Sequence, residues 1–221
     1  MTCLRPASDL HVICGDLRPA ASEPSLTGTA TRSAAGATRL GSVLSMPSTQ
    51  GNLDWQPLAD HLDLVASPVA AAAHLVPDAA VAAIDATLAD TAAFCAAYDV
   101  APEASANCVL VYGRRGEQTT YAAVMVLATD RADVNKVVRK ELGQRKMSFA
   151  DQDQAQQLTG MTQGGITPVG LPAGWPILVD EGVVAAGPVV IGGGVRDSKI
   201  LLDGAALARL PGARVLPLAI R

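Results

Sequence analysis

The chain has 221 residues, of which 49% are hydrophobic, so it can bury the core of one main domain. From Met46 onward it carries 13 basic and 18 acidic residues, a balance that argues against a broad nucleic-acid surface. Its longest apolar stretches are alanine-rich and end before the roughly 20 residues that a bilayer span needs, so we expect no membrane partner.

The first 45 residues differ in texture from the rest. The segment PAASEPSLTGTATRSAAGATRLGS is rich in Ser, Thr, Ala and Gly and has no period of 2 or 3.6 residues. Such a segment buries too little apolar area to offset the entropy of ordering it. We therefore expect residues 1–45 to be a disordered low-complexity extension and residues 46–221 to be the folded domain. Met46 is a candidate for the biological start; a transit peptide is the alternative, although three acidic residues count against it.

Helix and strand patterns alternate after Met46. Ser67 as N-cap and Pro68 at the first helical position predict a short helix, and LADTAAFCAAY predicts a longer one that starts near Asp90. VAAIDAT, between these two helices, is a candidate strand. ANCVLVYG and TTYAAVMVLAT are β-rich runs separated by the polar RRGEQ, which predicts a hairpin.

The second half of the chain continues the mixed pattern. RADVNKVVRKELG predicts an amphipathic helix that Asp133 caps and Gly143 ends. KMSFA predicts a short strand, and DQDQAQQLTG predicts a helix that leads into the loop GGITP, Gly164 to Pro168. WPILVD, PVVIG, KILLD and RVLPLA are strand-like, with a short helix GAALARL before the last. Because the hairpin disfavours an all-parallel sheet, we expect a mixed α/β fold.

Positive charge gathers in one part of this domain. The residues concerned are Arg131, Lys136, Arg139, Lys140, Arg145 and Lys146, and they outnumber the acidic residues near them. One basic helix face of this kind can meet a phosphate backbone at a single place. A solvated helix face is the alternative interpretation.

The order of the pieces is more informative than any one of them. A strand pair is followed by a helix bearing Asp133, the strand RKMSFAD, a helix ending in Thr159-Gly160, and the loop GGITP. This order resembles the YbaK/prolyl-tRNA-synthetase-associated domain family, whose members have a Lys-Lys-x-x-x-Ala strand and a GxxxP loop at these places. VVIGGGVRDSKILLDGAAL also resembles the family's closing strand, Gly-Gly turn and strand, so the resemblance covers about residues 67–218.

The resemblance implies a strongly curved mixed β-sheet that approaches a barrel and is surrounded by helices. It also implies hydrolysis of the ester that joins a wrongly attached amino acid to tRNA. In that reaction the ester oxygen gains negative charge, which backbone N–H groups can stabilise. Glycine permits close approach of the backbone, and proline fixes the exit from a loop.

GGITP is accordingly the first candidate for the site. We expect Gly164 and Gly165 to take part in catalysis, and Ile166, Thr167 and Pro168 to contact the substrate. The N–H groups around Gly165 and Ile166 are expected to face a pocket and to be unpaired within the protein. A loop used only for packing is the alternative.

Asn107 is where the sequence departs from the family. Deacylases of this family carry a lysine at the start of the strand that here reads ANCVLV, and matching the strands places Asn107 at that position. No lysine precedes Lys136, so a shift of register supplies none. An asparagine donates and accepts hydrogen bonds but brings no charge. We expect Asn107 to orient a substrate carbonyl or a water molecule; a strand-edge asparagine bonded to local backbone is the alternative.

Other polar residues follow the glycine turn in GGGVRDSK. Arg196, Ser198 and Lys199 are candidates for lining the same pocket, with Lys199 as a replacement cation. Cys108 is expected on the opposite sheet face from Asn107 and is therefore not a candidate nucleophile. The cysteines show no CxxC spacing and no nucleotide or metal motif is present, so we expect no metal, no cofactor and a reducing cytosol.

Three functions are compatible with these features. The first is a deacylase that acts in trans on the 3′ end of aminoacyl-tRNA. Action in trans is favoured because the sequence predicts one main domain and no synthetase domain. In such a deacylase, Asn107, the loop backbone and a ribose hydroxyl position a water molecule. The second is a catalytically silent member that binds aminoacyl-tRNA or a small ligand. The third is an interaction protein that keeps only the fold.

Removal of residues 1–45 is expected to leave the folded domain intact, because their composition offers little surface for packing. A protein that starts at Met46 should melt within a few degrees of the full chain and have the same activity. Thermal unfolding and activity of the two proteins, measured side by side, test this. A large loss of either property would show that the extension docks on the domain.

Overall fold

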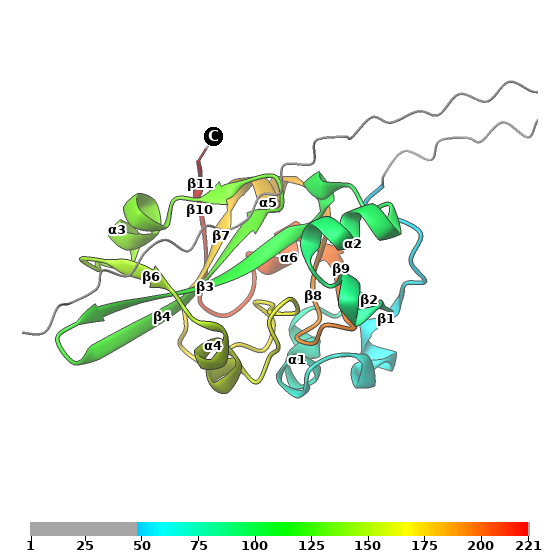
Figure 1. Ribbon diagram of the computed structural model, residues 1–221, viewed down its shortest axis with the longest axis horizontal. Helices are drawn as coiled ribbons and strands as arrows, with labels where there is room; N and C mark the ends of the chain where they lie inside the picture. The colour runs from blue at the N-terminus through cyan, green and yellow to red at the C-terminus, as the bar shows by residue number, and fades with distance from the viewer. Residues whose placement is uncertain (1–47, 221) are drawn as a thin grey trace, which may run out of the picture. The chain divides into compact units, whose positions relative to one another are not determined.

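The hairpin predicted between the two β-rich runs is the centre of the larger sheet. The computed structural model describes residues 48–220, so the predicted extension and the candidate start at Met46 lie outside the described residues. β3 (Ala106–Arg115) and β4 (Gln118–Leu127) pair antiparallel along their whole length, and Figure 1 shows them running together from the centre of the domain to the hairpin tip.

The larger sheet is mixed, as expected from the sequence. Its order is β10–β7–β4–β3–β6, with the remaining strands at β6 (Met147–Phe149), β7 (Ile177–Asp180) and β10 (Ala213–Leu216). β4, β7 and β10 are parallel, whereas β3 runs antiparallel to both of its neighbours. The predicted mixed α/β class is therefore confirmed.

A second sheet packs against the first. Its order is β1–β2–β9–β8, all antiparallel, with β1 at Gln56–Pro57, β2 at Ala80–Ala83, β8 at Pro188–Gly192 and β9 at Ser198–Asp203. A parallel bridge links Ser105, the residue before β3, to Val190 of β8. A third, two-stranded sheet pairs β5 (Arg131–Ala132) with β11 (Ala219–Ile220). Within residues 48–220 the sheets do not close, so the expected approach to a barrel is not confirmed.

The helices are short and cover the sheets. They are α1 (Ser67–Ala72), α2 (Thr91–Tyr98), α3 (Arg139–Glu141), α4 (Gln152–Thr159), α5 (Glu181–Ala185) and α6 (Gly204–Leu207). Short 3₁₀ turns occupy Leu58–Asp60, Leu62–Leu64, Ala73–Leu75, Ala86–Leu88 and Pro102–Ala104, and a π-helical turn spans Val134–Val138 before α3. None of the helices in the described part has both the length and the apolar character to cross a membrane.

Most of the predicted helix ends are correct. Asp133 caps its turn by accepting a hydrogen bond from the N–H of Lys136 at 3.0 Å, and α4 ends at Gly160 with a φ of +68°. The prediction for Ser67 was wrong by one residue. Ser67 lies inside α1, and Ala66 precedes the helix without a side-chain cap.

Of the three buried clusters among the described residues, two lie on the two faces of the larger sheet. The larger lies between the two main sheets and includes Leu110 and Met125 from one sheet and Val81 and Ile200 from the other. The smaller packs Val134 and Val138 against the outer face of β3 and β4. Apolar burial on both faces explains why β4 is an unbroken apolar run from Tyr121 to Leu127.

Asp180 ties the end of the chain to the larger sheet. The side chain is fully buried at the end of β7, and one carboxylate oxygen accepts from the N–H of Gly182 at 2.8 Å. The other oxygen accepts from the N–H groups of Leu218 and Ala219 at 2.7 and 2.9 Å. This carboxylate thus starts α5 and also holds the segment that leads into β11.

Asp180→Ala is expected to lower the free energy of unfolding by about 3 kcal/mol, because buried N–H groups lose charged acceptors. Asp203→Ala is the matched control: Asp203 is exposed and caps α6 with one bond to Ala205, so its loss should cost only about 1 kcal/mol. Urea unfolding of both variants measures the difference. Equal losses would contradict the role given to Asp180.

Candidate functional site

A cavity of about 280 Å³ opens where the two main sheets meet. Its walls come from residues 89–91 before and at the start of α2, 105–109 at the start of β3, 190–192 at the end of β8, the loop after α4, and Lys199 of β9. Three of the predicted site residues therefore reach it from separate parts of the chain: Asn107, Gly164 and Lys199. Ile166 also lines it.

Lys199 brings a buried cation to this cavity. Its side chain is 6% exposed, and its ammonium donates to the carbonyl oxygens of Ala89 at 2.8 Å and Gly164 at 3.3 Å. The ammonium also lies 5.1 Å from the centroid of the Phe94 ring. Burial lowers the pKa of Lys199 to about 8, so the side chain is mostly protonated at neutral pH. An ammonium has three N–H donors, and these two carbonyl groups occupy two of them.

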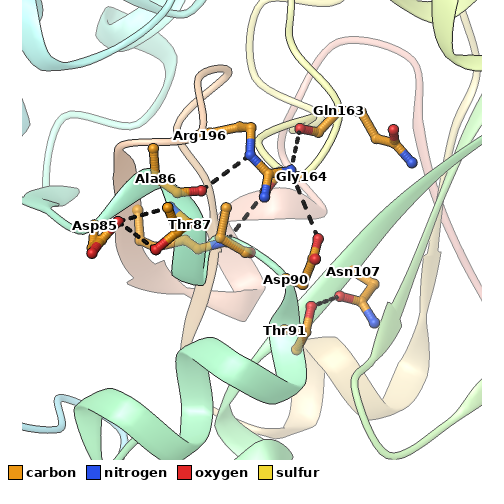
Figure 2. Close-up of polar contacts among 11 residues, drawn as sticks. Asp85, Ala86, Thr87, Asp90, Thr91, Asn107, Gln163, Gly164 and Arg196 are labelled. Carbon is orange, nitrogen blue, oxygen red and sulfur yellow. Dashed lines mark hydrogen bonds and ion pairs between the residues drawn. The ribbon is translucent and has the colours of Figure 1, made fainter. Parts of the chain in front are cut away.

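Asn107 is held by the first residue of α2. The hydroxyl of Thr91 donates to the side-chain oxygen of Asn107 at 2.7 Å, as Figure 2 shows. Because that oxygen is engaged, the NH₂ group of the half-buried amide is the part available to donate to a bound molecule. The cavity thus combines a cation from β9 with an amide from β3.

The glycines of GGITP bring two backbone segments into contact. Gly165 donates its N–H to the carbonyl of Thr162 at 3.0 Å and accepts from the N–H of Gly194 at 2.6 Å. The expectation that the Gly165 N–H is unpaired was therefore wrong. A Cβ on Gly165 would collide with the backbone of Val195, and one on Gly192 would collide with the carbonyl of Gly165. The glycines are required because the loop and the turn after β8 pack without room for side chains.

Gly164 has a different role from Gly165. Its φ is +85°, a conformation that favours glycine, and its carbonyl oxygen accepts from Lys199. The loop therefore presents an acceptor that positions the cation. The N–H of Ile166 donates no backbone hydrogen bond within the described residues, so of the two expected donors it alone lacks a backbone partner.

The other predicted residues lie around the cavity rather than in its wall. Thr167 and Ser198 are buried, and neither hydroxyl has a hydrogen-bond partner among the described residues. Pro168 lines a second cavity of about 360 Å³, which also includes Trp175. GGITP therefore borders two cavities, one at each end.

Arg196 joins three segments beside the first cavity. Its Nε donates to the carbonyl of Ala86 at 3.1 Å, and its Nη1 donates to the carbonyl of Gln163 at 3.2 Å. Nη1 also lies 3.7 Å from a carboxylate oxygen of Asp90 (Figure 2). Asp90 and Gln163 both line the cavity, so this partly exposed guanidinium holds two of its walls in place.

The thiols near the cavity are poor nucleophiles. Burial raises the pKa of Cys108 to about 12, and burial also raises the pKa of Cys95. Neither forms a disulfide. Among residues 48–220, no three His, Cys, Asp or Glu side chains are grouped so that they could hold a metal ion.

Comparison with known proteins identifies the family. The sequence model described as the aminoacyl-tRNA editing domain matches residues 85–210, more than half of the chain. This chain belongs to the aminoacyl-tRNA editing domain family. The match includes the whole first cavity, from residue 89 to Lys199.

Solved structures show the same fold at low sequence identity. A protein described as a candidate trans-editing enzyme for prolyl-tRNA synthetase superposes with a TM-score of 0.60 at 20% identity, over 70% of this chain and 96% of that one. A scaffold protein from computational epitope grafting gives 0.61 at 22% identity, over 71% and 97%. A hypothetical protein gives 0.57 at 20% identity, over 63% and 90%.

This editing domain carries its buried cation on β9. The resemblance leads us to expect a lysine at position 107 on β3, and the chain has Asn107 there. Lys199 enters the same cavity from the opposite sheet. Thr91, which orients Asn107, was not predicted, although its place at the start of a helix beside Asp90 was visible in the sequence.

The buried ammonium predicts a measurable pH dependence of stability. The pKa of Lys199 is about 8 in the folded protein, against an ordinary value of 10.5. Below pH 8 the side chain is charged in both states, and folding bears the full cost of burying it. Between these values only the unfolded chain keeps the proton, so this group makes the free energy of unfolding rise with pH.

Lys199→Met removes this rise. We expect the stability of the wild type relative to the variant to increase by about 2–3 kcal/mol from pH 7 to pH 10. Urea unfolding of both proteins at four pH values measures it, and titrations common to the two cancel in the difference. A difference that stays constant with pH would mean that Lys199 is not buried as a cation.

Proposed function

We propose that this editing domain is a trans-acting deacylase that hydrolyses the ester between an amino acid and the 3′ end of a mischarged tRNA. The observation that carries the proposal is the buried ammonium of Lys199 beside Asn107 in a cavity within the matched region. Family membership supports aminoacyl-tRNA as the substrate class. The proposed catalytic domain is residues 46–221, acting in the cytoplasm without a cofactor.

The proposed reaction requires one bond to form and one to break. A water molecule attacks the ester carbonyl carbon, the carbonyl oxygen gains negative charge, and the ester C–O bond breaks. The ribose oxygen leaves with a proton, and the products are the free amino acid and tRNA. A neighbouring ribose hydroxyl can help to position the water, which reduces the need for a base from the protein.

Each proposed residue has a separate part in this reaction. Lys199 stabilises the developing negative charge with the N–H that its two carbonyl partners leave over. The amide of Asn107 donates to the substrate carbonyl or to the water, with its orientation set by Thr91. Gly164 positions Lys199 through its carbonyl oxygen. The loop therefore acts through this acceptor and not through the N–H of Gly165, which was first expected to be a free donor. The N–H of Ile166 is a further donor for the substrate.

The remaining residues act around this centre. Arg196 offers a cation at the edge of the cavity for a phosphate of the tRNA, in competition with Asp90. Thr167, Pro168 and Ser198 support the loop and the turn from behind rather than by contact with the ester. In this proposal the start of GGITP contributes to substrate binding and its end, Thr167 and Pro168, contributes to packing.

Amino acid release from a panel of mischarged tRNAs tests the proposal. Lys199→Met is expected to lower kcat/KM for the best substrate at least about 100-fold, the size typical for loss of one donor to the oxyanion. Arg209→Met, at an exposed cation outside the cavity, is the matched control and should leave the rate unchanged. Adding Asn107→Lys to Lys199→Met should restore part of the activity, because it returns a cation to the cavity from β3.

Two results would count against this proposal. If every mischarged tRNA loses its amino acid at the same rate with and without the protein, the protein is not a deacylase. Full activity of Lys199→Met would remove Lys199 from the mechanism.

The asparagine favours a second candidate function. Asn107 brings no charge, as expected for a member that binds aminoacyl-tRNA without hydrolysing it. Binding of a mischarged tRNA that remains intact for hours would favour this candidate over the first.

A further inference from the structure

A row of aromatic rings lies away from the cavity, on the hairpin and the loop before β7. Tyr112 of β3 and Tyr121 of β4 have ring centroids 5.9 Å apart, and Tyr121 stacks on Trp175 at 4.9 Å with only 10° between the planes. The guanidinium of Arg114 lies 5.7 Å from the centroid of the Tyr112 ring. We refer to Arg114, Tyr112, Tyr121 and Trp175 as the aromatic ladder.

The ladder is a feature of the surface rather than of the core. The chain has only seven aromatic Phe, Trp and Tyr residues, and three of them stand in this row. All three rings are half-buried, whereas Phe94 is buried completely. Tyr112 and Tyr121 are directly opposite in the register of β3 and β4, so their rings share one face of the sheet. Gln154 of α4 donates to the Tyr121 hydroxyl at 2.9 Å and fixes that ring.

Positive charge surrounds the hairpin end of the ladder. Arg114 and Arg115 end β3, and the register of β3 with β6 places Met147 opposite Gly113. Arg145 and Lys146, immediately before Met147, therefore lie beside the two arginines. All four cations are exposed, and neither of the two ion pairs in the described region uses them. Glu117 is the one acidic residue in the turn, so this end is positive in a chain of net charge −4.

We propose that the aromatic ladder and its four flanking cations bind single-stranded RNA. Bases of any sequence stack on aromatic side chains, and arginine and lysine contact the phosphates between them. A row of planar groups beside several cations fits a strand of alternating bases and phosphates. A large apolar protein interface is a poor alternative, because only three half-buried rings are present and charged side chains lie beside them.

The position of the ladder indicates which nucleotides it meets. Asn107 and Tyr112 are five residues apart on β3, which corresponds to about 17 Å at about 3.4 Å per residue. The aminoacylated nucleotide cannot occupy both places. The inference rests on the proposed function for its substrate: with the ester at Lys199, the ladder contacts nucleotides that precede the 3′ end of the tRNA.

Binding of uncharged tRNA tests the ladder without any ester to hydrolyse. Tyr112→Ala and Arg114→Ala are each expected to raise Kd about fivefold or more, measured by fluorescence anisotropy. Arg114→Ala should also reduce the slope of log K against log salt by about 0.7, the value for one lost contact with a single-stranded phosphate.

Two matched controls should stay within twofold of the wild type. Phe149→Ala removes a 63% exposed aromatic side chain that pairs with the buried Val111 and therefore lies on the other face of the sheet. Arg209→Ala removes an exposed cation near α6. Arg114 is exposed, so its variant keeps the test valid if Tyr112→Ala does not fold.

The outcomes separate this inference from the proposed function. Weakened tRNA binding by both ladder variants supports the ladder even if the wild type hydrolyses no ester. In an active enzyme the ladder variants should raise KM with kcat unchanged, whereas Lys199→Met should lower kcat with Kd for uncharged tRNA unchanged.

Unchanged Kd and salt slope in both ladder variants would overturn the inference, whatever the hydrolysis assay shows. A short single-stranded RNA should compete with tRNA for the wild type. Competition by a blunt RNA duplex of the same length, with none by the single strand, would equally overturn it.

Discussion

The site depends on the close contact between two backbone segments, the GGITP loop and the glycine turn after β8. Gly165 and Gly194 are joined by a hydrogen bond of 2.6 Å, and neither Gly165 nor Gly192 has room for a Cβ. This contact sets the position of the Gly164 carbonyl, to which the ammonium of Lys199 donates. A buried cation is costly unless fixed acceptors surround it, so the glycine contact and the cation belong together.

Much of the fold was predictable because local patterns and tertiary packing agree. The polar RRGEQ between two apolar runs predicted the hairpin, and Asp133 and Gly160 lie at ends of helical segments, as their residue types suggested. The predictions failed where a neighbouring segment decides. Whether the sheets close into a barrel depends on contacts such as the Ser105–Val190 bridge, and no local pattern encodes those contacts.

The sequence predicted which residues form the site better than it predicted how they contact one another. Asn107, Gly164 and Lys199 were candidates on sequence grounds, and all three line one cavity. Which N–H of the loop is free could not be predicted. The N–H of Gly165 donates to Thr162 on the same loop, and the carbonyl of Gly165 accepts from Gly194, and no sequence pattern indicates these partners. In β9 Lys199 is followed by the unbroken apolar run of residues 200–202, so the sequence has no alternation that would tell a solvent-facing lysine from a buried one.

The entry of Lys199 from β9 has a consequence for the evolution of the family. Asn107 and Lys199 line a cavity of only about 280 Å³, and two ammonium groups there would repel each other and lower each other's proton affinity. Relatives should therefore tend to carry a lysine at one of these two positions and a neutral residue at the other. A change of strand for the cation would then need two coupled substitutions, with an intermediate sequence that has either both charges or none.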